Sequence, residues 1–128
     1  MSWLQHTQNP KALLGYYGQA PSLDNVTLHS LALRRDGPTA ELVLDLEQFP
    51  AKPSTRWPAE SNTCQVTLQA VGVERVTVRH WGTGVLGTLE VTARSGFIKL
   101  SFTGQARFEL ACLQVSISKV SGYKSSEA

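Results

Sequence analysis

The residues that could form a catalytic triad are few in this sequence. The histidines and aspartates are His6, His29, His80, Asp24, Asp36 and Asp45. Nucleophilic catalysis needs a hydroxyl or thiol beside a base, and a third group that orients the base. Asp36 falls in a predicted turn, Asp45 lies on the polar face of a predicted strand, and His29 lies at a predicted bulge. No triad results, and we expect no catalytic residues and no enzymatic activity.

Two other patterns suggest chemistry at first sight. Glycoside hydrolysis uses paired carboxylates, but Glu41, Asp45 and Glu47 share one predicted strand, where they more simply solubilise its outer face. The glycines of segment 82–87 resemble a phosphate-binding loop. This segment lacks the P-loop lysine and precedes no helix, so we interpret it as a flexible connection between strands.

The cysteines and histidines predict no metal site. Cys64 and Cys112 both occupy apolar positions of strand-like runs, and free cysteine packs as a small hydrophobic residue. A disulfide between them would need adjacent strands and an oxidising compartment. No Cys-x-x-Cys motif is present and the histidines are far apart, so a zinc site has no ligand set. We expect two reduced core thiols, no metal and no cofactor.

Composition limits the remaining classes. The chain has 128 residues, 41% of them apolar and 17% charged, which suits one folded domain over residues 1–128. A formal charge of +2 falls short of the footprint of a nucleic-acid binder. The longest uncharged stretch, 61–73, is too short to span a membrane. The first residues lack the basic and apolar regions of a signal peptide, so we expect a cytoplasmic protein with neither nucleic acid nor membrane as partner.

Apolar residues alternate with polar ones along most of the chain, which indicates strands. The runs are 26–33, 42–46, 63–70, 76–81, 88–94, 98–102 and 108–117. Turns separate them at short intervals, which is typical of an antiparallel β-sandwich or a curled, barrel-like sheet. The fold class predicted is therefore all-β, with about seven strands.

Finer features of the pattern predict local structure. The alternation shifts by one residue at His29-Ser30, which predicts a bulge, and again after Cys112, which predicts that the last strand is long and bulged. Near the N-terminus, Asn9 as N-cap and Pro10 as first residue predict about one helical turn over 11–14. The tail 121–128 has the composition of a frayed end.

The three tryptophans have separate interpretations. Trp57 lies in the proline-rich loop 49–62, where it either plugs the open end of the sheet or serves as a binding anchor. Trp81 alternates with the polar residues of its predicted strand, so a core position and a surface position are equally compatible with the pattern. Trp3 could staple the leading segment onto the sheet. Two exposed, coplanar tryptophans would form a platform for stacking on sugars.

The order and spacing of several short motifs resemble the immunity protein 50 family of bacterial toxin systems. The motifs are Pro21-Ser22-Leu23, Leu28-His29-Ser30-Leu31 before Arg35-Asp36-Gly37-Pro38-Thr39, Phe49-Pro50, Arg56-Trp57, and Gly72-Val73-Glu74-Arg75-Val76 before His80-Trp81-Gly82. The resemblance implies a small cytoplasmic antidote, encoded beside a polymorphic toxin, that binds the toxin protein and blocks it without chemistry.

The charge of the chain bears on what such a toxin looks like. Inhibitors of basic nucleases usually present acidic surface, whereas this chain is slightly basic. Either the toxin is not strongly basic, or the contact is mostly apolar and hydrogen-bonded, or acids cluster locally around Glu41, Asp45 and Glu47. The sequence leaves these three possibilities open.

Two irregular segments contain the residue types that anchor interfaces. The toxin-interface candidates are Arg56, Trp57, Glu60, Arg79, His80 and Trp81. Two other classes stay open: a carbohydrate- or other ligand-binding β-module that uses exposed tryptophans, and a subunit that adds an edge strand to a larger assembly. The sequence does not fix the oligomeric state.

Overall fold

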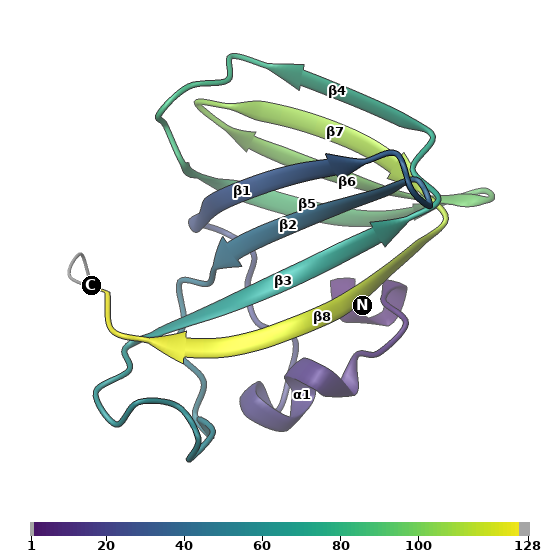
Figure 1. The fold of residues 1–128 in the computed structure, drawn as a ribbon. Helices are drawn as coiled ribbons and strands as arrows, with labels where there is room; N and C mark the ends of the chain where they lie inside the picture. Colours follow the sequence, from purple (N-terminus) through teal and green to yellow (C-terminus); the bar gives the residue numbers. More distant parts are fainter. Residues whose placement is uncertain (1, 126–128) are drawn as a thin grey trace.

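The alternating segments form one antiparallel sheet of eight strands, which does not close into a barrel (Figure 1). The computed structural model describes residues 2–125. The strands are β1 (Val26–Arg34), β2 (Thr39–Asp45), β3 (Thr63–Val71), β4 (Arg75–Arg79), β5 (Leu86–Arg94), β6 (Phe97–Gly104), β7 (Arg107–Cys112) and β8 (Gln114–Tyr123). Their order in the sheet is β4-β7-β6-β5-β1-β2-β3-β8. The predicted all-β class and the curled sheet are confirmed.

The sheet consists of two four-stranded halves joined by a short ladder. Strands β1 and β5 pair at only two positions, Val26 with Gly87 and Thr27 with Leu86. Beyond this ladder β1 departs from β5 and crosses in front of it in Figure 1. One half is therefore β4-β7-β6-β5 and the other is β1-β2-β3-β8.

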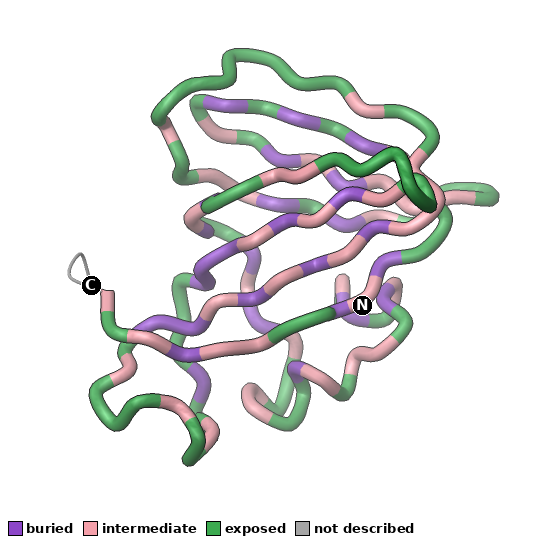
Figure 2. The backbone as a smooth tube through the Cα atoms, viewed as in Figure 1, coloured by how far each residue is buried: buried purple, intermediate pink, exposed green. Residues whose placement is uncertain are grey.

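One apolar core lies between the halves. Alternate residues are buried in it, as period two requires, along every strand except the edge strand β4 and the second half of β1. Its largest fully buried side chains are Phe102, Phe108, Leu4, Leu13, Leu42, Leu44, Leu68, Leu100, Leu110, Val26, Val66 and Val115. Figure 2 shows this alternation in the central strands and, in contrast, a largely exposed β4 and following connection. β4 is thus the least covered strand.

Two turns and one bulge occur where the sequence predicts them. Gly37 and Gly96 have φ of 110° and 83° in the turns of the first hairpin and the β5–β6 hairpin, a region that glycine adopts without strain. The β1–β2 register shifts between Leu28 and Ser30. A second shift, between Thr67 and Leu68 in the β3–β8 pair, was not predicted.

The predicted single long strand over 108–117 is wrong. The predicted strand is interrupted at Leu113, whose backbone N–H donates to the Val71 carbonyl. Before the break β7 pairs with β4 and β6, and after it β8 pairs with β3 at the other edge of the sheet. The parity shift therefore marks a crossing between the two halves, and the count is eight strands instead of seven.

The helical prediction is also corrected. The N-terminal segment forms a short 3-10 helix, η1 (Trp3–His6), and a longer helix, α1 (Lys11–Tyr17), which passes through Gly15 and ends at Gly18 with φ of 75°. The Asn9 side chain does not cap α1. Its amide donates to the Ile117 carbonyl and accepts from the Ile117 N–H, both at 2.8 Å, so it ties the helix to β8.

The C-terminal strand extends further toward the C-terminus than predicted. Residues 121–123 belong to β8 and pair with the start of β3, so the expected frayed end does not begin at Ser121. Residues 126–128 of that expectation lie outside the described part of the chain. Within residues 2–125, none of the helices has the length and apolar character needed to cross a bilayer.

Candidate functional site

One of the two predicted interface segments, Arg79 to Trp81, lies at the end of β4, where the chain leaves the sheet. Arg79 is the last residue of β4, His80 has a left-handed φ of 56°, and Trp81 is 55% exposed. The connection must reach β5, three places along the sheet, and it passes the β6–β7 turn, where Gly84 lies against Gln105. This path leaves the indole of Trp81 on the surface.

Trp57, in the other predicted interface segment (56–60), packs against three neighbouring residues. Its ring stacks on Tyr16 at the end of α1, with centroids 5.1 Å apart and planes at 19°, and meets Phe49 edge-on at 5.9 Å. On another side it lies against Gly122 of β8, where a Cβ atom would come within 2.3 Å of the ring. Trp57 therefore fastens the loop 49–62 to the helix and to the end of β8.

The charged neighbours of Trp57 face solvent. Arg56 and Glu60 are both exposed, and Glu60 accepts from Lys124 Nζ at 3.4 Å. The backbone N–H of Arg56 donates to Ser54 Oγ, which shapes the turn. An exposed ion pair of this kind contributes little to stability.

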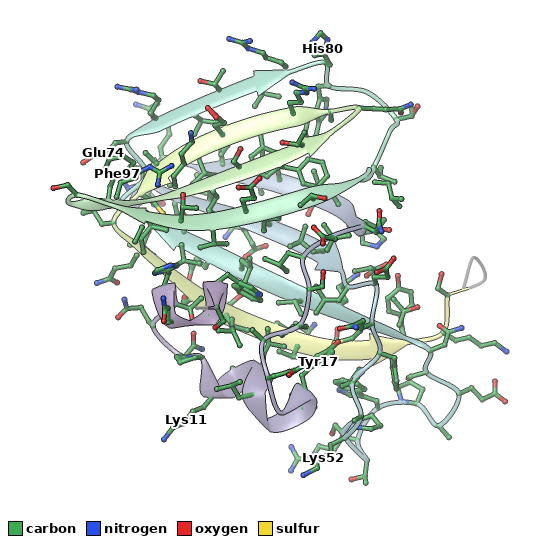
Figure 3. The ribbon with its side chains drawn as sticks, turned by 180° about the vertical axis from the view of Figure 1, so that it is seen from behind. Lys11, Tyr17, Lys52, Glu74, His80 and Phe97 are labelled. Atoms are coloured by element: carbon green, nitrogen blue, oxygen red, sulfur yellow. The ribbon has the colours of Figure 1, made fainter. Side chains whose placement is uncertain are left out.

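The structure does not bring the two predicted segments together. Figure 3 labels Lys52, in the loop that contains Trp57, near the bottom of the molecule, and His80 near the top. Arg56, Trp57 and Glu60 thus lie far from Arg79, His80 and Trp81, and the six candidates form two separate surfaces.

A polar network that the sequence did not predict lies on the outer face of β1-β2-β3-β8. At its centre is Asp45, which is only 8% exposed. Its Oδ2 lies 2.6 Å from His29 Nε2 and also accepts from the Tyr123 hydroxyl, while Oδ1 accepts from Gln65 Nε2 at 3.1 Å. One carboxylate therefore links all four strands.

This network corrects the interpretation of Asp45 as a solubilising surface residue. Its position directly across from Gln65 was derivable once β2 and β3 were paired. The contribution of Tyr123 was not, because the tail was expected to fray. A hollow of about 510 Å³ lies over the network and also includes Glu47 and Lys124.

The outer face of the other half is basic. Five cationic side chains, which we call the basic face, line two adjoining hollows of about 480 and 270 Å³; they are Arg75, Arg79, Arg94, Lys99 and Arg107. The two hollows share Thr77 and Glu109. In Figure 3, Glu74 and Phe97 lie at one end of this half and His80 at the other.

The cations of the basic face are poorly compensated. Lys99 pairs with Glu109 at 3.1 Å. Within residues 2–125, no ion pair involves Arg75, Arg79, Arg94 or Arg107. Arg79 stands directly across the β4–β7 ladder from Arg107, and like charges in that position repel.

The thiols are free and buried, as predicted. Burial raises the pKa of Cys112 to about 11, although a backbone hydrogen bond at Gln114 acts in the opposite direction. Burial likewise raises the pKa of Cys64, and a hydrogen bond with Tyr17 partly offsets this effect. The pKa of the Tyr17 phenol is also raised, mainly by burial and to a smaller extent by its interaction with Cys64. Such neutral, buried thiols are inert.

Metal-ligating side chains are dispersed. Within residues 2–125, no three of the His, Cys, Asp and Glu side chains are grouped so that they could hold a metal ion. The exposed groups of the types that anchor interfaces include Trp81, the cations of the basic face and the loop around Arg56 and Glu60.

These features define a small all-β protein with one open sheet and anchor residues on its surface. The chain belongs to the immunity protein 50 family, which matches residues 9–123, in agreement with the order of its motifs. No curated protein and no solved structure matches it.

Proposed function

We propose that this chain is the antidote of a bacterial toxin, and that it binds the toxin protein in the cytoplasm and blocks it without catalysing a reaction. The observation that carries the proposal is the family match, which covers residues 9–123 and so all eight strands of the sheet. The inert character of both thiols is compatible with a reducing compartment.

The interface candidates keep different roles in this proposal. Arg79, His80 and Trp81 are exposed at the end of β4 and would contact the toxin directly. Arg56 and Glu60 are also exposed, and Trp57 would act by holding their loop in place. Tryptophan and arginine dominate the binding energy of many interfaces, which favours Trp81 and Arg79 as the strongest contributors.

The alternative of a sugar-binding module loses its premise. It required two exposed, coplanar tryptophans, but Trp57 is stacked on Tyr16. Trp3 packs against the core and donates its indole N–H to the Pro21 carbonyl at 2.8 Å, as a staple of the N-terminal segment. Only Trp81 of the three is exposed, so we do not propose this function.

The test is co-expression with the toxin encoded beside the gene of this chain. We expect growth to be rescued, the two proteins to co-purify, and the dissociation constant to be about 1 nM or lower, about −12 kcal/mol. An active toxin that kills the cells despite soluble expression of this chain, and that does not co-purify with it, would contradict the proposal.

A further inference from the structure

We infer that the toxin docks on the basic face through an acidic protein surface. This inference rests on the proposed function, because it names the surface that binds the toxin and the chemistry of the partner. It does not follow from the net charge, since a chain with a formal charge of +2 has no strong overall preference for acidic or basic partners. It follows from where the charges lie.

The first argument is the direct pairing of two arginines. Arg79 and Arg107 face each other across the β4–β7 ladder, on the same face of the sheet. This arrangement costs stability in the free protein. A carboxylate placed between the two guanidinium groups removes the repulsion and accepts hydrogen bonds from both, because arginine presents its donors in a planar fork.

The second argument is that protection of the sheet edge does not account for the basic face. Charges on an edge strand prevent pairing with other chains, and this explains Arg75 and Arg79 on β4. It does not explain Arg107, which has no ion pair and lies on β7, a strand paired with β4 on one side and with β6 on the other. The cations extend inward over the sheet, as a docking surface would require.

The third argument is the difference in charge between the hollows of the two halves. The hollows of the basic face are lined by five cations and by two carboxylates, Glu74 and Glu109. The hollow of the other half is lined by Asp45, Glu47, His29 and Lys124. Of these three hollows, the two of the basic face have the excess of cations that an acidic partner would complement, and complementary charges accelerate and orient association.

The fourth argument identifies the partner as protein. The chain belongs to a family of immunity proteins, and an exposed aromatic residue, Trp81, adjoins the basic face at the end of β4. A tryptophan beside arginines is the composition of a protein-binding hot spot. Single-stranded nucleic acid is the other polyanion that this surface could take, and the experiment separates the two.

The experiment compares matched charge reversals. The double variant Arg79→Glu/Arg107→Glu alters the basic face, and Arg34→Glu/Lys119→Glu alters two exposed cations of the other half. Each protein is titrated calorimetrically with the toxin domain encoded beside the gene, and separately with a short single-stranded RNA. Arg79→Gln/Arg107→Gln serves as a milder version, which keeps the test valid if the double reversal fails to fold.

We expect the basic-face reversal to weaken toxin binding by about 100-fold or more, and the Gln version by about 10-fold, through loss of arginine contacts. The control should stay within about threefold of wild type. Toxin binding unchanged in the basic-face variants would overturn this inference alone. Loss of RNA binding with toxin binding unchanged would also overturn it. Absence of wild-type binding to an active toxin would instead overturn the proposed function, and this inference with it.

Discussion

The carboxylate of Asp45, at the end of β2, lies 2.6 Å from Nε2 of His29, at the bulge of β1. His29 is the residue that the bulge leaves out of the β1–β2 register. Together with Gln65 of β3 and Tyr123 of β8, the pair forms a hydrogen-bond network on the outer face of β1-β2-β3-β8. The network lies near the C-terminal end of β8. The contact therefore binds the C-terminal strand to the first hairpin.

Replacement of Asp45 tests this role. Asp45→Ala removes the common acceptor of three side chains, and we expect the free energy of unfolding to fall by about 1 to 3 kcal/mol, the cost of losing hydrogen bonds to a buried, charged acceptor. Glu41→Ala, on the same strand, should change it by less than about 0.5 kcal/mol. Urea denaturation measures both. Equal effects of the two variants would show that Asp45 is an ordinary surface carboxylate.

The two tryptophans of the candidate segments should separate packing from binding. Trp57→Ala removes a stacked ring and should destabilise the protein by roughly 3 kcal/mol, at the low end for buried aromatic residues because Trp57 is half-buried. Trp81→Ala should alter stability by less than about 0.5 kcal/mol and weaken toxin binding. Thermal unfolding and calorimetric titration of the same two variants give the comparison. A Trp81 variant that unfolds as readily as the Trp57 variant would contradict this assignment.

Gly122 and Trp57 should show thermodynamic coupling. A Cβ at position 122 would meet the Trp57 ring at 2.3 Å, so Gly122→Ala forces the ring aside and should cost about 1 to 3 kcal/mol, as overpacking does. In the Trp57→Ala background the same change has room. A double-mutant cycle should therefore give a coupling energy of at least about 1 kcal/mol. Additive effects would place Trp57 away from β8.

Much of the fold was predictable because strand alternation is a local signal. The turn at Asp36-Gly37 and the bulge near His29 follow from residue type and parity alone. The break at Leu113 was not predictable, since a parity shift looks the same in a bulged strand and in a strand that ends and restarts. Only the pairing partners, β4 and β6 before the break and β3 after it, distinguish the two cases.

The candidate surfaces were predictable only in part, for a related reason. The residue types that anchor interfaces can be recognised in the sequence, which is how Arg79 and Trp81 were selected, but the exposure of Trp81 could not be predicted. The basic face depends on register: Arg107 belongs to it because it faces Arg79, from which 27 residues of chain separate it. Asp45 was misread because its partner Tyr123 comes from the last strand.

Alkaline pH should destabilise the protein through Cys112. Burial raises its pKa to about 11 in the folded state, against about 8.5 for a free thiol. Between these values the unfolded chain loses a proton that the folded chain keeps, so stability is complete below the lower value and falls as pH rises toward the upper one. Cys112→Ala should show a weaker decline in unfolding free energy from pH 8 to about pH 11. Parallel curves for variant and wild type would contradict the prediction.

A single reversal at Arg79 should raise stability and weaken binding at once. Arg79→Glu replaces a repulsive pair with an attractive one across the β4–β7 ladder, because Arg107 remains opposite. We expect a gain in unfolding free energy of about 0.2 to 1 kcal/mol, the range for cross-strand charge pairs, that shrinks with added salt. Arg34→Glu, which faces Thr39, is the matched control and should gain nothing. Urea denaturation at low and high salt measures the unfolding free energy of each variant, and calorimetric titration with the toxin measures its affinity. A more stable variant that binds toxin less well would mean that Arg79 is retained for recognition at the expense of the fold, whereas a variant that loses both stability and binding would mean that Arg79 supports the strand itself.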